Sequence, residues 1–86
     1  MKYQLTTPVV HNDVTYSELT FREAETGDLM ASDKFEGRTS KVAAILASMS
    51  DIPLPAFRKI KARDFKNIMI ATAELMGEDE PITTGE

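Results

Sequence analysis

Residues 2–21 read KYQLTTPVVHNDVTYSELTF and carry β-branched and aromatic side chains at a density that favours β-strands. Residues 11–13 (His-Asn-Asp) divide this stretch with polar turn formers. Centring a turn on the last two of them pairs Val9 with Tyr16 and puts Leu5 on the same face, because strand side chains alternate. The sequence therefore predicts a β-hairpin over about 2–21.

In the second strand of this hairpin, the apolar side chains switch from one face of the strand to the other. Val14 and Tyr16 share one face, whereas Leu19 and Phe21 share the other. Either a bulge lies between Tyr16 and Leu19, or both faces are partly covered. Pro8 cannot donate a backbone hydrogen bond to a neighbouring strand, so we expect it at an edge or in a bulge. Two strands alone are marginal in water, so the hairpin must pack on helices or on another molecule.

The rest of the chain shows helical periodicity in short segments. Thr26 is the expected N-cap of the first helix, and Gly37 is its expected end. In the second helix, apolar residues at i, i+3, i+4 and i+7 predict one buried stripe of Val42, Ile45, Leu46 and Met49. The expected helices span about 27–35, 38–50, 55–60 and 62–76.

A proline-rich break separates the second helix from the last two. Residues 51–55 (DIPLP) contain two prolines, and each disfavours helix in the residue before it. Pro55 can begin a short helical turn that carries Phe57 and Ile60 inward. Gly77 supplies a stop for the final helix.

The expected fold class is α+β, with an N-terminal β-hairpin followed by three to four short helices in a single small domain of residues 1–77. The chain has 86 residues, no cysteine and a formal charge of −4, from 10 basic and 14 acidic side chains. Residues 78–86 (EDEPITTGE) hold four of the acids and no base, so the rest of the chain is neutral. We expect this acidic tail to be disordered, because it has few apolar residues.

Candidate groups for catalysis are few. His11 is the only histidine and stands beside the predicted turn, with no cysteine to share a metal. There is no glycine-rich phosphate loop, and so small a body offers little room for a cleft that shifts a carboxyl pKa. No stretch approaches the roughly 20 apolar residues of a membrane span. We therefore expect no enzyme activity, no catalytic residue, no cofactor, no metal and no membrane partner, and the lack of cysteine favours the cytoplasm.

The strongest local charge anomaly is a basic segment at 58–66. It holds five basic residues against one acid, Asp64. Such a segment can contact phosphates as part of a helix-turn-helix, although only Asn67 resembles the base-reading side chains that accompany it. A small nucleic-acid-binding regulator is therefore an alternative function. A neutral body argues against it and favours a solvated helix face.

Some apolar side chains of the strands and helices are candidates for contact with a protein partner. Methionine adapts to apolar partner segments, and the second face of the hairpin strand is not explained by its pairing. The predicted contact residues are Leu19, Phe21, Met30, Phe57 and Met69.

Three stretches of the chain, in order, resemble the tail assembly chaperones of Mu-like and P2-like contractile-tailed bacteriophages. They are VTYSELTFREAETGDL (14–29), DIPLPAF (51–57) and RDFKNIMIATAELMG (63–77). The positions that match the family pattern are Tyr16, Leu19, Phe21, Arg22, Glu23, Gly27, Asp28, Pro53 and Asp64. Ala24 departs from the pattern, in which proline is frequent after the Arg-Glu pair.

The resemblance implies a non-catalytic chaperone of phage or prophage origin that binds the tape-measure protein during tail morphogenesis. The tail-tube protein is a further candidate partner. The resemblance also implies a location in the cytoplasm of the bacterial host and absence from the mature virion. A minor structural tail component is the remaining alternative, and the hairpin and the Ala-rich second helix leave a homo-oligomer open.

Overall fold

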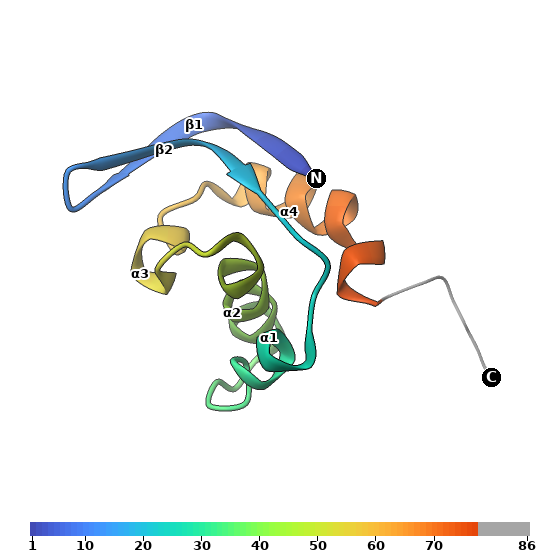
Figure 1. The fold of residues 1–86 in the computed structure, drawn as a ribbon. Coiled ribbons are helices and arrows are strands. Elements are labelled where there is room, and N and C mark those ends of the chain that lie inside the picture. Colours follow the sequence, from blue (N-terminus) through green and yellow to red (C-terminus); the bar gives the residue numbers. More distant parts are fainter. Residues whose placement is uncertain (78–86) are drawn as a thin grey trace.

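A β-hairpin and the helices that cover one of its faces make up the computed structural model, which describes residues 1–77 (Figure 1). The elements are β1 (Lys2–His11), β2 (Val14–Thr20), α1 (Thr26–Met30), α2 (Arg38–Ser50), α3 (Leu54–Phe57), α4 (Ala62–Thr72) and a 3-10 helix, η1 (Glu74–Met76). The expected α+β class, a hairpin followed by short helices in one small domain, is confirmed. The predicted disorder of 78–86 concerns a segment outside the described residues.

The hairpin turns at Asn12 and Asp13, as predicted. Both residues have positive φ, 51° and 66°, which asparagine and aspartate tolerate better than most residues. Two such residues in succession form the kind of turn whose twist matches that of the flanking strands. The turn sets the register, and Val9 pairs with Tyr16 as expected.

An irregularity in β1 explains the phase change of the hairpin. Near the turn Val9 pairs with Tyr16, but at the far end Gln4 pairs with Glu18. The register shift therefore places residues 5–8 of β1 opposite residue 17 alone. The extra residues lie on β1 and include Pro8, in keeping with its expected place in a bulge. Beyond this irregularity, β2 turns its other face toward the core.

The hairpin and the helices meet in one apolar core. In Figure 1 the helices lie on the concave side of the hairpin, where β1 contacts α3 and α4. α2 contacts both α1 and α3. The core consists of Leu5, Val9, Leu19, Phe21, Leu46, Ala47, Met49, Phe57 and Ile68. Packing of the hairpin on the helices thus buries the apolar surface that two strands alone would leave exposed.

The first helix is shorter than expected. Glu25 is its N-cap, so Thr26 is the first helical residue, and the helix ends at Met30 instead of near position 35. Gly37 does not end this helix; it is the N-cap of α2, with a φ of +91°. Glycine reaches this backbone conformation at low cost, so the chain can turn there and begin α2 at Arg38, the predicted start.

The buried face of α2 is displaced from the predicted stripe. Val42 and Ile45 are half-buried, and two alanines are buried with the other stripe residues. The buried residues of α2 are Ala44, Leu46, Ala47 and Met49. Alanine lets a neighbouring backbone approach closely, so the alanine side of α2 is buried as well. The stripe of large apolar residues alone therefore did not identify the side of α2 that packs inward.

The end of α2 carries a left-handed residue that is not glycine. Asp51 has a φ of 57° and ψ of 38°, and the following Ile52 donates its backbone N–H to the Ala47 carbonyl at 3.0 Å. Because glycine adopts this conformation without the steric cost of a Cβ, Asp51→Gly is expected to raise the free energy of unfolding by about 0.5 to 1 kcal/mol. Urea titration measures the change. An equal gain in Asp51→Ala, which removes the charge but keeps a Cβ, would show that charge, and not backbone conformation, is responsible.

The proline break behaves as predicted. α3 begins at Leu54 with Pro55 in its first turn, and it is shorter than the expected 55–60. Phe57 is buried, and Ile60 is half-buried against the core. The break therefore folds the chain back from α2 toward α4.

The last helix ends earlier than expected. α4 stops at Thr72, whose hydroxyl donates to the Ile68 carbonyl at 2.7 Å, and the chain tightens into η1. Gly77 ends η1 with a φ of +82°, the left-handed conformation expected for a glycine at that position. The backbone N–H of Ala24 donates to the Leu75 carbonyl at 2.8 Å, a bond that a proline at position 24 could not make.

Candidate functional site

An open groove of about 550 Å³ lies between the N-terminal half of α2, α3 and the start of α4. Its apolar lining consists of Phe35, Ala43, Leu54, Phe57, Ile60, Ala62 and Phe65. Thr39, Ser40 and Arg58 add polar groups. The proline break brings these residues together, because it turns the chain between α2 and α4.

Three of the four phenylalanines of the chain line this groove. Phe57 is buried, whereas Phe35 and Phe65 are half-buried. The rings of Phe57 and Phe65 meet edge to face, with centroids 6.2 Å apart and planes at 80°. The Lys34 ammonium lies 5.6 Å from the Phe35 ring centroid, within the range of a cation–π contact. Partly exposed aromatic side chains in a concave surface are typical of a binding site.

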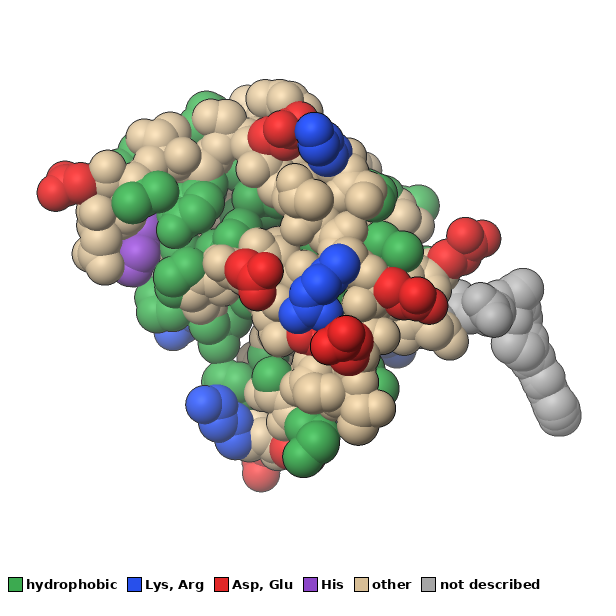
Figure 2. Space-filling view, in the orientation of Figure 1, with side chains coloured by type: hydrophobic (Ala, Val, Ile, Leu, Met, Phe, Trp, Pro, Cys, Tyr) green, Lys and Arg blue, Asp and Glu red, His purple; other side chains and the backbone are tan. Residues whose placement is uncertain are grey.

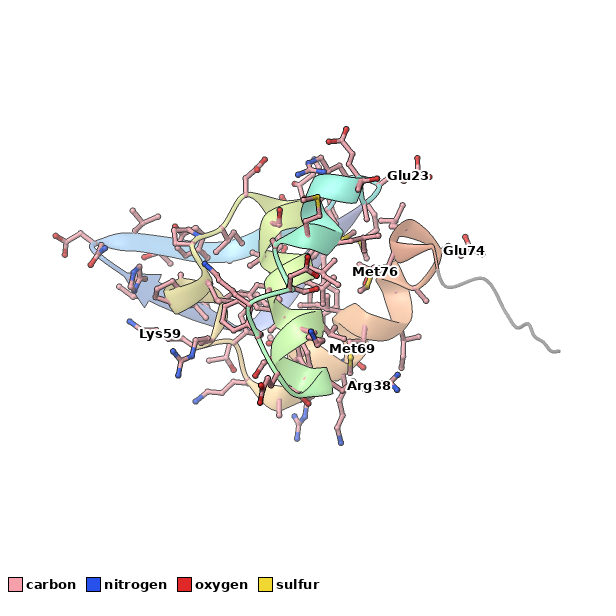
Figure 3. All side chains as sticks on the ribbon, turned by 90° about the horizontal axis from the view of Figure 1, so that it is seen from below. Glu23, Arg38, Lys59, Met69, Glu74 and Met76 are labelled. Carbon is pink, nitrogen blue, oxygen red and sulfur yellow. The ribbon has the colours of Figure 1, made fainter. Side chains whose placement is uncertain are left out.

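Arg58 lines the groove, and four more basic residues follow it within the 58–66 segment. We call the five basic residues of the 58–66 segment the basic rim, and all five are exposed: Arg58, Lys59, Lys61, Arg63 and Lys66. Figure 3 shows nitrogen-tipped side chains projecting along one side of the molecule, from Lys59 toward Arg38. The ion pair found within residues 1–77 joins Arg22 to Asp28 and involves no residue of the rim.

The predicted contact residues do not form one surface. Leu19 and Phe21 are each 1% exposed and belong to the core. Met30 is 63% exposed on α1, and Met69 is half-buried against the core from α4. Phe57 alone among the five lines the groove. The neighbours of Phe57 in the groove were missed, although the concentration of phenylalanine on both sides of the proline break was a usable signal.

Other exposed apolar side chains are dispersed. Val10 and Val14 lie near the hairpin turn, and Ile70 is 77% exposed on α4. Figure 2 shows hydrophobic side chains near the free end of the hairpin and also at several separate places on the same face. Scattered single residues of this kind are normal on a protein surface, so the groove is the better candidate for a binding site.

Two residues of the family pattern, the exposed Arg22 and the buried Asp28, form one polar cluster. The Arg22 guanidinium donates to both carboxylate oxygens of Asp28, at 2.7 and 2.9 Å, and to the Ser48 carbonyl at 3.1 Å. The backbone N–H of Glu25 and the hydroxyl of Ser48 also donate to this carboxylate. Asp28 is 3% exposed. The hydrogen bonds to its carboxylate tie the end of β2 and α1 to α2.

Asp64 forms a second buried polar cluster with β1. Its carboxylate accepts from the Tyr3 hydroxyl at 2.9 Å, and from the Thr6 hydroxyl and backbone N–H at 3.0 and 3.1 Å. The Thr7 backbone N–H approaches at 3.4 Å. Thr6 and Thr7 belong to the irregular stretch of β1, so Asp64 satisfies backbone groups that the register shift removes from the strand ladder.

Both aspartates stay ionised in the folded protein. The hydrogen bonds from Arg22 hold the pKa of Asp28 well below its usual range, with further help from the Glu25 N–H and Ser48. At Asp64, burial favours the neutral acid, but the hydrogen bonds from Thr6, Tyr3 and Thr7 outweigh it and lower the pKa. Each carboxylate is fully engaged by structural donors, which gives it a structural role.

The remaining residues of the family pattern contribute to the scaffold or the surface. Leu19 is in the core, Tyr16 is half-buried against it, and Glu23 is exposed. Gly27 lies in α1. Within residues 1–77, no three His, Cys, Asp or Glu side chains gather as a metal site, and no helix has the length and apolar character to cross a membrane. His11 is the last residue of β1, beside the turn.

Comparison with protein families gives one match. The family model described as "Phage tail assembly chaperone proteins, E, or 41 or 14" matches residues 2–77. The match covers nearly the whole chain, so this protein belongs to the phage tail assembly chaperone family. No curated protein and no solved structure matches it.

Proposed function

We propose that this protein binds the tape-measure protein during phage tail morphogenesis and catalyses no reaction. Family membership supports an assembly role. The observation that carries the proposal is the groove, which three of the four phenylalanines line, with Phe35 and Phe65 half-buried at its surface. A small domain gains stability from apolar burial, so leaving aromatic area at the surface favours a partner that covers it.

A chaperone of this kind works by mass action. It binds the aggregation-prone form of its client and lowers the free concentration of that form. The same proposal places the protein in the host cytoplasm during assembly of a contractile tail and leaves it out of the mature virion. The tail-tube protein is a candidate second partner.

Coexpression tests the proposed function. The tape-measure protein of the same phage is expressed with and without this chain, and its soluble fraction and copurification are measured. We expect the chain to raise the soluble fraction and to copurify with its client. Equal solubility in both cultures would overturn the proposal, and detection of the chain in purified virions by mass spectrometry would favour a structural tail component.

A further inference from the structure

The basic rim carries positive charge that no acid of its own segment offsets at the surface. Asp64 is the only acid among residues 58–66, and it is fully buried. Its carboxylate is turned toward β1 and engaged by Tyr3, Thr6 and Thr7. The segment therefore presents five exposed cations, of which Arg58 lines the apolar groove and Lys59 donates its ammonium to the Val10 carbonyl at 3.1 Å, although residues 1–77 as a whole are neutral.

The elements around the groove restrict the backbone conformation of a partner. The lining comes from helices α2, α3 and α4 and from the segments that join them, not from β1 or β2. A partner segment there finds no strand edge with which to pair its backbone groups. Because backbone N–H and C=O groups must be satisfied when they are buried, a helix, which satisfies them internally, fits the groove better than an extended peptide.

We propose that the groove binds an amphipathic helix of the client, with large apolar side chains on one face and acidic residues beside them. This inference rests on the proposed function and assigns the surface and the partner chemistry. The apolar anchors enter between Phe35, Phe57 and Phe65, and the flanking acids meet the basic rim. Arg58 is central to this arrangement, because it both lines the groove and belongs to the rim.

Two variants separate the apolar and the charged parts of the surface. Ala43→Trp places a large side chain in the groove without removing a core residue, since Ala43 is half-buried and lines it. Arg58→Glu reverses a charge at an exposed position. Lys2→Glu is the matched control for the charge change, because Lys2 is exposed and lies at the start of β1. Circular dichroism establishes that each variant keeps the fold.

Binding is measured by fluorescence anisotropy with labelled peptides of about 25 residues that tile the tape-measure protein of the same phage, a length that allows helix formation. We expect the binding peptides to be acidic and amphipathic. Arg58→Glu and Ala43→Trp should each weaken their binding about tenfold or more, and Lys2→Glu less than about twofold. A peptide with its flanking acids changed to lysine should recover affinity for Arg58→Glu, which a merely structural effect of the substitution would not produce.

The outcomes distinguish this inference from the proposed function. Full-length tape-measure protein that copurifies equally with wild type, Arg58→Glu and Ala43→Trp overturns the groove assignment while leaving the chaperone role intact. Absence of any binding peptide also overturns it. Tighter binding of a single-stranded oligonucleotide than of any peptide, lost in Arg58→Glu and falling steeply with salt, overturns it in favour of a nucleic-acid partner.

Discussion

Replacing Asp64 by alanine is expected to lower the free energy of unfolding by about 3 to 5 kcal/mol, because it removes a buried carboxylate that accepts hydrogen bonds from several neutral donors and leaves those donors unsatisfied. A domain of this size has a total stability of roughly 4 to 13 kcal/mol. The substitution therefore removes a large share of the stability, and partial unfolding at 37 °C is the expected result.

The reason lies in the geometry around the Asp64 carboxylate. The irregular stretch of β1 has backbone N–H groups without a partner on β2, and those of Thr6 and Thr7 point at Asp64. Alanine leaves these donors and the Tyr3 hydroxyl unsatisfied at a site that water reaches poorly. The loss also disconnects α4 from β1, an interface that buries Ile68 and Leu5 in the core.

Two further substitutions make the Asp64 prediction specific. Asp64→Asn keeps the shape but replaces an acceptor by a donor, so we expect a smaller loss of about 2 to 3 kcal/mol. Asp33→Ala removes an exposed carboxylate outside the clusters and should change stability by less than about 0.5 kcal/mol. Urea unfolding followed by circular dichroism measures all three. Similar midpoints for Asp64→Ala and Asp33→Ala would refute the structural role.

The parts of the fold that depend on neighbouring residues could be predicted from the sequence. The turn at Asn12 and Asp13 follows from their tolerance of positive φ, and it sets the pairing of Val9 with Tyr16. The bounds of α2 follow from periodicity and the proline break. In each case the deciding residues stand within a few positions of one another.

Contacts across the chain could not be predicted in this way. The partners of Asp64 lie 57 to 61 positions away, and nothing in the first turn of α4 identifies them. Asp64 appears in the sequence as one acid in a basic segment, whereas in the structure its carboxylate accepts hydrogen bonds from β1. The same limit applies to the groove, because Phe35 and Phe65 become neighbours only after the proline break folds the chain back.

The strand pattern alone could not assign Leu19 and Phe21 to the core. Their phase differs from that of Tyr16, which suggested a free face for a partner. The register shift in β1 instead turns that face into the core, where each residue is 1% exposed. A change of phase in a strand pattern therefore marks an irregularity in pairing as readily as a contact surface.

Acidification is expected to unfold the protein through Asp28 and Asp64 together. Folding lowers the pKa of both carboxyl groups. As the pH falls, the unfolded chain therefore binds protons first, near its aspartate pKa of about 3.9. The stability that the two groups contribute is fully present above that pH, and it is lost as the pH falls through their folded-state pKa values. Between the unfolded-state pKa and its own folded-state pKa, each group contributes a slope of at most about 1.4 kcal/mol per pH unit, and the two together contribute at most about 2.7.

Asp28→Asn tests the share of one group in this slope. The amide cannot be deprotonated and holds Arg22 less strongly, so we expect lower stability at pH 7 and an acid slope reduced by about half. Urea midpoints between pH 7 and pH 2.5 give the slope for wild type, Asp28→Asn and the Asp33→Asn control. An Asp28→Asn profile parallel to that of the wild type would contradict the assignment. Loss of the slope in Asp28→Asn/Asp64→Asn would show that the two clusters, which hold α1 on α2 and α4 on β1, account for the acid sensitivity of the fold.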